Sequence, residues 1–206
     1  SYDTESELYQ LYTAPQRGIQ SDDEQIVELA QEIVGDERNV YKQVLLIQSW
    51  VQLNVLYPQH GTLYPDDALM CIDQGVGDCA GQSKTFVALS RALGIPARTI
   101  SGLHPFEFGP GPLTEFGPRA SWTGRNLSMH VWCEVYLPSL GWVQVEPDIP
   151  GYGVPLERLI VRRGPFAFQD GLCRQQTYFH MPLAVYGDWC GYSAGRETSI
   201  DVQEIE

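Results

Sequence analysis

The chain has 206 residues, of which 43% are hydrophobic and 19% are charged, so it is long enough to bury a sizeable core as one domain. Its formal net charge of −13 disfavours nucleic acid and anionic lipid, and no apolar run is long enough to cross a bilayer. We therefore expect no nucleic-acid and no membrane partner. Such a surface would attract a cationic substrate, but solubility is the simpler explanation for the acidity.

The cysteines indicate free thiols. They are Cys71, Cys79, Cys133, Cys173 and Cys190. An odd count without close spacing is typical of a reducing compartment. The acidic start, Ser1–Glu7, lacks the basic and apolar regions of a signal peptide, so we expect a cytoplasmic location, with a removed signal peptide as the alternative. His130 and Cys133 have ligand-like spacing, but on a strand they would point to opposite faces, so we expect no metal.

Helices are predicted for the first third of the chain. Residues 1–20 form a polar arm, and the capping box Ser21–Glu24 opens a helix that ends at a glycine. A second helix is expected over residues 39–56, with Trp50 and Tyr57 more typical of the core than of a ligand site.

The most informative helix follows a glycine turn. A short helical piece at Asp67–Ile72 comes first, with Cys71 as a buried filler. Asp78 then acts as the N-cap of a helix that carries Cys79 in its first turn. Its apolar positions are Phe86, Leu89 and Leu93. The helix dipole and the unpaired N–H groups favour a thiolate at Cys79, and the same N–H groups could hold an oxyanion.

Strands are predicted for the next part of the chain. One covers residues 97–103, and the connection 104–128 either walls a substrate cleft or packs as an Ω-loop. A hairpin follows, with strands over 129–137 and 142–146 joined by a turn. Alternation places these side chains on one face: His130, Trp132, Glu134 and Tyr136, with Trp142, Gln144 and Glu146 on the partner strand.

The hairpin supplies a base and an acid. With a three-residue loop it can bring His130 close to Glu146 or to Asp148, and in one of the two possible registers Asp148 lies directly across from His130. A carboxylate beside a histidine fixes the imidazole tautomer and stabilises the imidazolium. Cysteine, histidine and acid together point to nucleophilic catalysis.

Four segments carry a resemblance to a known family. They are Gly77-Asp78-Cys79-Ala80-Gly81, Ala88–Arg98, His130–Leu137 and Gly141–Pro147. In this order they resemble the transglutaminase-like superfamily, over roughly residues 40–150. The resemblance implies a papain-like α+β fold, in which N-terminal helices and the nucleophile-bearing helix pack on an antiparallel β-sheet. It also implies a Cys-His-Asp triad.

The resemblance assigns the site residue by residue. Cys79 matches the nucleophile and His130 the base, and Glu146 stands where the family has the aspartate of an Asp-Pro pair. Glutamate is one methylene longer, so the departure leaves Asp148 as a rival acid. Arg98 stands where the family keeps an arginine, and we interpret it as structural.

Beyond residue 150 the resemblance fades. Strands are expected over 156–163 and 177–185, and the acidic tail 201–206 is expected to fray, all within one domain of residues 1–206.

The expected function is cysteine-dependent amide hydrolysis of a peptide or protein substrate, through a thioester and without a cofactor. A protein-glutamine transglutaminase that uses an amine acceptor would pass through the same thioester. A non-catalytic binding module of the same fold and a small-molecule acyl transferase are further alternatives. The sequence identifies neither substrate-binding residues nor the oligomeric state.

Overall fold

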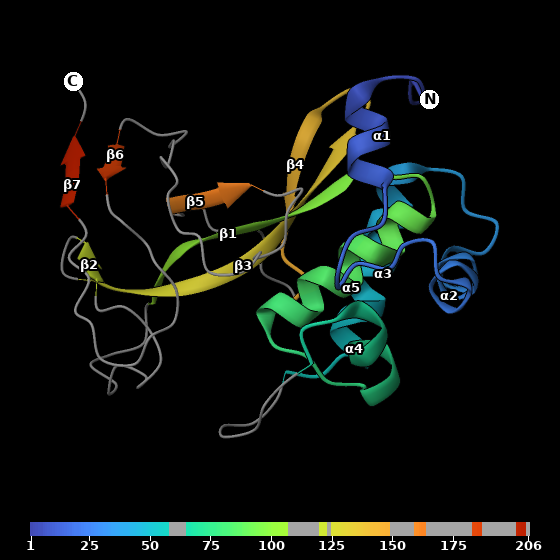
Figure 1. Ribbon diagram of the computed structural model, residues 1–206, viewed down its shortest axis with the longest axis horizontal. Helices are drawn as coiled ribbons and strands as arrows, with labels where there is room; N and C mark the ends of the chain where they lie inside the picture. Colours follow the sequence, from blue (N-terminus) through green and yellow to red (C-terminus); the bar gives the residue numbers. More distant parts are fainter. Residues whose placement is uncertain are drawn as a thin grey trace. The chain divides into compact units, whose positions relative to one another are not determined.

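The structure is a computed structural model that describes residues 1–57, 65–106, 120–122, 125–148, 159–163, 183–186 and 201–204 (Figure 1). The helices are α1 (Glu7–Thr13), α2 (Glu24–Val34), α3 (Val40–Asn54), α4 (Ala68–Gln74) and α5 (Cys79–Ala92). The strands are β1 (Ala97–Phe106), β2 (Ala120–Trp122), β3 (Arg125–Leu137), β4 (Gly141–Val145), β5 (Leu159–Arg163), β6 (Leu183–Tyr186) and β7 (Asp201–Glu204). Helices with an antiparallel sheet make this an α+β fold, as predicted.

The chain divides into two compact units. One contains the five helices and the β3–β4 hairpin, and the other contains β2, β5, β6 and β7, while β1 and β3 run through both. The assignment of residues 1–206 to a single domain stays a prediction.

Side-chain caps begin all five described helices. The caps are Ser6, Asp23, Asn39, Asp67 and Asp78. The predicted capping box at Ser21 is wrong, because α2 begins at Glu24 and the Asp23 carboxylate accepts from the Gln25 N–H at 3.0 Å. The Ser21 hydroxyl instead donates to the Thr13 carbonyl at 3.3 Å.

The N-terminal arm contains a helix that the sequence analysis did not predict. Helix α1 has seven residues, too few for a hydrophobic period to stand out. The Tyr2 hydroxyl donates to the Tyr136 carbonyl at 2.8 Å, and Arg91 donates to the Ala14 carbonyl at 2.6 Å. These long-range bonds tie the arm to α5 and to β3.

Helix α5 lies at the centre of the helical unit. Every residue from Gly81 to Arg91 is buried, so polar side chains are buried as well as apolar ones. Lys84 pairs with the Asp66 carboxylate, and Arg91 donates to the Ala97 carbonyl at 2.9 Å. Buried polar groups are tolerated when they are hydrogen-bonded in this way. The helix that begins at Cys79 is therefore held on all sides.

The β3–β4 hairpin has the predicted three-residue loop. Cys133 pairs with Val145 and Leu137 with Gly141, which has a φ of +76°. The Leu140 N–H donates to the Leu137 carbonyl at 3.0 Å, as in a turn followed by a left-handed residue. On one face the hairpin buries Cys133, Val135 and Val145 in the core.

The second unit differs from the sequence prediction at its boundaries. Strand β1 continues to Phe106 and pairs antiparallel with β5, and β2 pairs with β3, so the expected connection over 104–128 is partly strand. Residues 107–119 and 123–124 lie outside the described residues, as do 156–158 and 177–182 of the two predicted C-terminal strands. Residues 201–204 of the tail form a strand where fraying was expected, because β7 pairs with β6.

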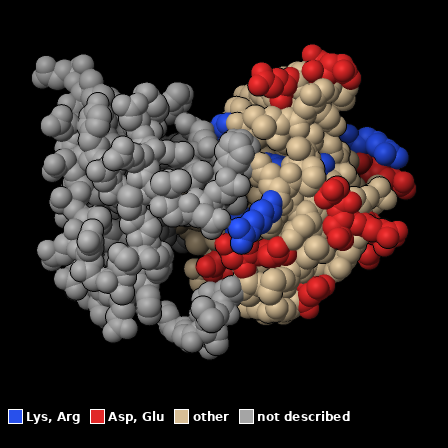
Figure 2. All heavy atoms as spheres, in the orientation of Figure 1, with Lys and Arg blue, Asp and Glu red and all other residues tan. Residues whose placement is uncertain are grey.

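Two aromatic predictions have different outcomes. Trp50 packs against the core, whereas Tyr57 is 56% exposed, so its assignment to the core is wrong. Cys71 is buried, as predicted. On the face shown in Figure 2, the described Asp and Glu side chains gather in several groups with few Lys or Arg between them. Among the described residues, no helix is long and apolar enough to span a membrane.

Candidate active site

Cys79 is the first residue of α5 and the only partly exposed cysteine among the three that the structure describes. Asp78 caps the helix, and its Oδ1 accepts from the N–H groups of Ala80 and Gly81, both at 3.0 Å. The cap therefore works as predicted, but it places a carboxylate at the positive end of the helix.

The electrostatics of Cys79 differ from the expectation. The pKa of the Cys79 thiol is raised to about 12, chiefly by burial and then by the charge of Asp78. Asp148 and Glu146 contribute smaller increases, and a hydrogen bond with the Val131 backbone opposes them. The expected thiolate character is therefore wrong for this state of the protein. The main cause is burial, which disfavours a charged sulfur, and the carboxylate of Asp78 at the start of the helix adds to it.

Strand β3 passes directly beside the start of α5. The Ser83 hydroxyl donates to the Val131 carbonyl at 3.2 Å, and the Cys133 thiol donates to the Ser83 carbonyl at 3.4 Å. Val131, whose backbone contacts the Cys79 sulfur, is joined to His130 by a peptide bond. The chain thus brings His130 to the level of the thiol.

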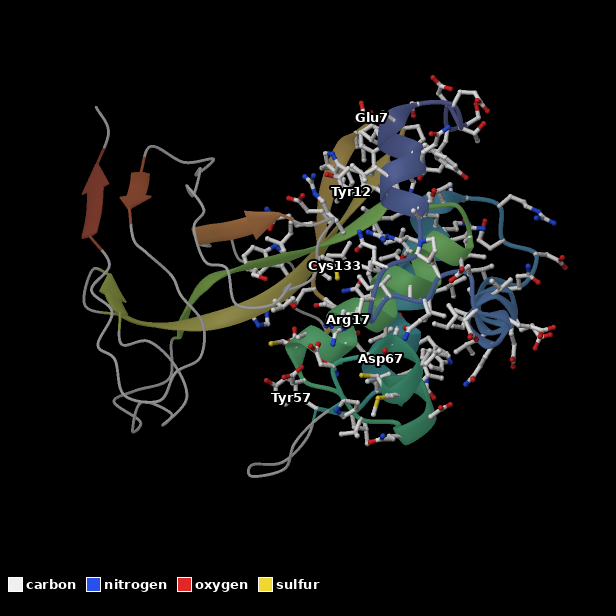
Figure 3. The ribbon with its side chains drawn as sticks, in the orientation of Figure 1. Glu7, Tyr12, Arg17, Tyr57, Asp67 and Cys133 are labelled. Carbon is white, nitrogen blue, oxygen red and sulfur yellow. The ribbon has the colours of Figure 1, made fainter. Side chains whose placement is uncertain are left out.

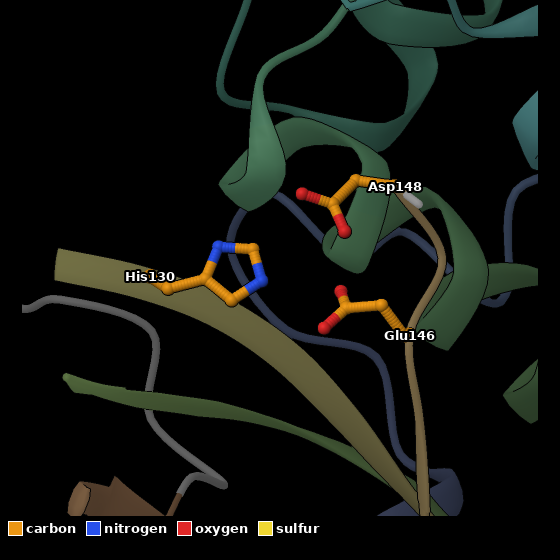
Figure 4. Close-up of side chains that lie close together, drawn as sticks. All are labelled: His130, Glu146 and Asp148. Atoms are coloured by element: carbon orange, nitrogen blue, oxygen red, sulfur yellow. The ribbon is translucent and has the colours of Figure 1, made fainter. Parts of the chain in front are cut away.

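His130 lies with two carboxylates. Donor atoms of His130, Glu146 and Asp148 all lie within 4.8 Å of one another. Figure 4 shows the ring nitrogen farther from the backbone, Nε2, pointing toward both carboxylates. Counting on from the Cys133–Val145 pair, the register sets Asp148 across from His130 and Glu146 across from Trp132. This is the one of the two registers that favours Asp148.

The two carboxylates are held differently. Glu146 is 1% exposed, and its backbone carbonyl accepts from Gln48 Nε2 at 2.8 Å and from Gln52 Nε2 at 3.3 Å, which fixes it to α3. Asp148 is partly exposed. The structure thus brings together His130 and both candidate acids.

The same three side chains form a donor set for a metal. An imidazole and two carboxylates suit a divalent cation such as Zn²⁺. Among the described residues, these are the ones whose donor atoms lie near enough to share an ion. Cys133, which the sequence spacing suggested as a possible partner of His130, is not part of this set.

Tyr57 is a site residue that sequence reasoning missed. Its hydroxyl shares a hydrogen bond with the Cys79 side chain. Burial, followed by the charges of Cys79, Asp78 and Asp148, raises its pKa well above the usual value. Figure 3 shows Tyr57 at the edge of the helical part, in contrast to Cys133 within it. No sequence pattern indicates this contact, because it depends on a backbone bridge between Leu56 and Val76.

The chain matches a known protein family. A family model described as the transglutaminase-like superfamily matches residues 27–147, more than half of the chain. The chain belongs to the transglutaminase-like superfamily. This confirms the resemblance inferred from the sequence, and the matched residues include Cys79, His130 and Glu146 but end before Asp148.

Two individual proteins are also similar to this chain. The chain is 30% identical over 149 residues to the uncharacterised protein YebA of Bacillus subtilis strain 168, covering 66% of this chain and 19% of YebA. It is 33% identical over 129 residues to an uncharacterised protein of Haemophilus influenzae, covering 59% of this chain and 35% of the relative. The chain therefore spans only about a fifth to a third of these relatives.

A solved structure extends the likeness to the fold. It is described as a candidate cysteine protease from Cytophaga hutchinsonii, is 29% identical and has a TM-score of 0.51. The match covers 66% of this chain and 40% of that chain.

Proposed function

We propose that the protein is a cysteine-dependent amide hydrolase, a protease or amidase, with Cys79 as nucleophile and His130 as general base and acid. The observation that carries the proposal is the constellation at the start of α5. Cys79 contacts the backbone of Val131, and the neighbouring His130 lies with Glu146 and Asp148 within 4.8 Å. The likeness to a candidate cysteine protease supports the same reading.

The resting thiol is neutral, so the reaction needs the base. The proton of Cys79 passes to Nδ1 of His130 while sulfur bonds to the acyl carbon and the carbonyl π electrons move to oxygen. When the carbonyl re-forms, the C–N bond breaks and the leaving amine takes the proton from His130. Water, deprotonated by His130, then attacks the thioester, and the acid and the free thiol are released.

Glu146 is the proposed orienting acid. Its burial and the bonds from Gln48 and Gln52 to its carbonyl hold it in one place, and a fixed carboxylate best selects one tautomer of His130. Asp148 is the second candidate, favoured by the β3–β4 register.

The acids can be ranked by substitution. Glu146→Gln should lower kcat by about 10²–10⁴-fold, since an amide cannot stabilise the imidazolium, and Asp148→Asn should have a smaller effect. Asp36→Asn, at an exposed carboxylate, is the matched control. A larger loss in Asp148→Asn would transfer the orienting role to Asp148.

Hydrolysis is proposed over amine transfer because water is abundant and an amine acceptor must be positioned to compete. Incubation with a peptide library, with and without a labelled primary amine, separates the two when the products are identified by mass spectrometry. We expect cleavage or deamidation that Cys79→Ala abolishes. Amine incorporation that outruns hydrolysis would make the protein a transglutaminase. If no product forms and Cys79 does not react, the protein is a binding module of the same fold.

A further inference from the structure

The segment after α3 is fixed against the segment that leads into α5. The Leu56 N–H donates to the Gly75 carbonyl at 2.9 Å, and the Gly77 N–H donates to the Leu56 carbonyl at 3.1 Å. Gln82 Nε2 also donates to the Val55 carbonyl. These bonds hold the residues just before Tyr57 against the turn that leads into Cys79.

The Tyr57 side chain reaches the reacting atom of the site. Its hydroxyl shares a hydrogen bond with the Cys79 side chain, although the residue is 56% exposed. A tyrosine that served only as a core filler would bury its ring. The exposure leaves the ring room to adjust as the sulfur gains a substituent.

The reaction at Cys79 needs hydrogen-bond donors that the Ala80 and Gly81 N–H groups do not supply. When sulfur bonds to the acyl carbon, negative charge develops on the carbonyl oxygen, and hydrogen-bond donors must lie near that oxygen. Two N–H groups in the first turn of α5, those of Ala80 and Gly81, already donate to Asp78. These two N–H groups are therefore occupied by the Asp78 carboxylate and do not serve the oxyanion role suggested by the sequence.

We propose that the Tyr57 hydroxyl donates a hydrogen bond to the oxyanion formed during acylation of Cys79. This inference rests on the proposed function of Cys79 as nucleophile. The oxyanion lies two bonds from the sulfur, so a donor that reaches the sulfur needs only a small rotation to reach the oxygen. Tyr57 keeps its proton throughout, because partial burial, and then proximity to Cys79, Asp78 and Asp148, disfavour a phenolate. The thiol proton still goes to His130.

The test compares two reactions of the same thiol. Alkylation by iodoacetamide displaces iodide and forms no oxyanion, whereas acylation by p-nitrophenyl acetate passes through one. Tyr57→Phe should therefore lower the rate of Cys79 acetylation by about 10–10³-fold and leave alkylation within about 3-fold of wild type. Acetylation is followed by p-nitrophenolate release and by the mass of the peptide that contains Cys79, with Cys79→Ala as the background.

Tyr41→Phe, at a tyrosine that is 55% exposed on α3, is the matched control and should change neither rate. If acetylation of Tyr57→Phe stays within 3-fold of wild type, or if both rates fall together, Tyr57 is not an oxyanion donor. If wild-type Cys79 is alkylated but never acetylated, the proposed hydrolase function fails and the inference falls with it. Circular dichroism verifies that each variant is folded.

Discussion

A buried ion pair on the second face of the hairpin allows a quantitative prediction. Arg98 donates from Nε and from Nη2 to Glu134 Oε2 at 2.8 and 2.6 Å. The side chains are only 12% and 4% exposed. The guanidinium also lies 3.8 Å from the centroid of the Trp142 ring and bonds to the Tyr12 hydroxyl at 3.2 Å. Arg98 thus joins β1, β3, β4 and α1, consistent with the structural role expected from the sequence.

Arg98→Met should lower the free energy of unfolding by about 3–5 kcal/mol, because it leaves the Glu134 carboxylate buried without the guanidinium. That loss is a large share of the roughly 5–15 kcal/mol that keeps a typical domain folded. The double variant Arg98→Met/Glu134→Met should recover most of it, since no charge is then buried. Urea unfolding followed by far-ultraviolet circular dichroism measures both variants without relying on Trp142 fluorescence.

The exposed pair of Lys42 and Glu37 supplies the control. Its atoms are 3.6 Å apart and the lysine side chain is 65% exposed, so Lys42→Met should cost at most about 1 kcal/mol. The reasoning is refuted if Arg98→Met costs no more than Lys42→Met, or if the double variant is less stable than Arg98→Met.

Three further predictions concern the cysteines and the glycine that packs against one of them. In Gly81→Ala the new Cβ would lie 2.7 Å from Cys71 Sγ and 2.8 Å from the Pro65 carbonyl oxygen. Although alanine has the better helix propensity, the free energy of unfolding measured in urea should therefore fall by about 1–3 kcal/mol. Burial raises the pKa of the Cys71 thiol to about 11, whereas the unfolded thiol loses its proton at about pH 8.5. Between these pH values the Cys71 thiol should therefore lower the free energy of unfolding by up to ~1.4 kcal/mol per pH unit. Cys71→Ala should make the pH dependence of the free energy of unfolding shallower in urea titrations, and an unchanged dependence would contradict this prediction. Iodoacetamide should modify Cys79 before Cys71 or Cys133, at a rate that rises steadily with pH. Peptide mapping that finds Cys133 modified first would count against the site, and a rate flat above pH 7 would contradict the raised pKa of the Cys79 thiol.

The features predicted correctly from the sequence are those encoded locally. Asp78 caps α5 because a cap depends on residues two or three positions away, and the β3–β4 turn follows from a short glycine-containing segment. Alternation also placed His130 and Glu146 on one face. Period-two alternation leaves a choice of register, however, so it could not rank Glu146 against Asp148.

The features that were missed depend on contacts distant in sequence. The pKa of the Cys79 thiol depends first on burial and then on the charges of Asp78, Asp148 and Glu146, two of which follow β4 in the sequence. Tyr57 reaches Cys79 only because Leu56 pairs with Val76. Neither effect has a local sequence pattern. The helix dipole alone favours a thiolate at Cys79, but the negative charge of the Asp78 cap opposes it.

The burial of α5 also determines which parts of the protein are free to respond to a substrate. Amide protons along a helix enclosed by its neighbours exchange with solvent only when the surrounding structure opens, so those from Gly81 to Arg91 should be among the slowest in the protein. Cys79 stands at the end of this slowly exchanging helix and is partly exposed. Cys79 is thus a fixed point, and any adjustment to a bound substrate must come from side chains around it.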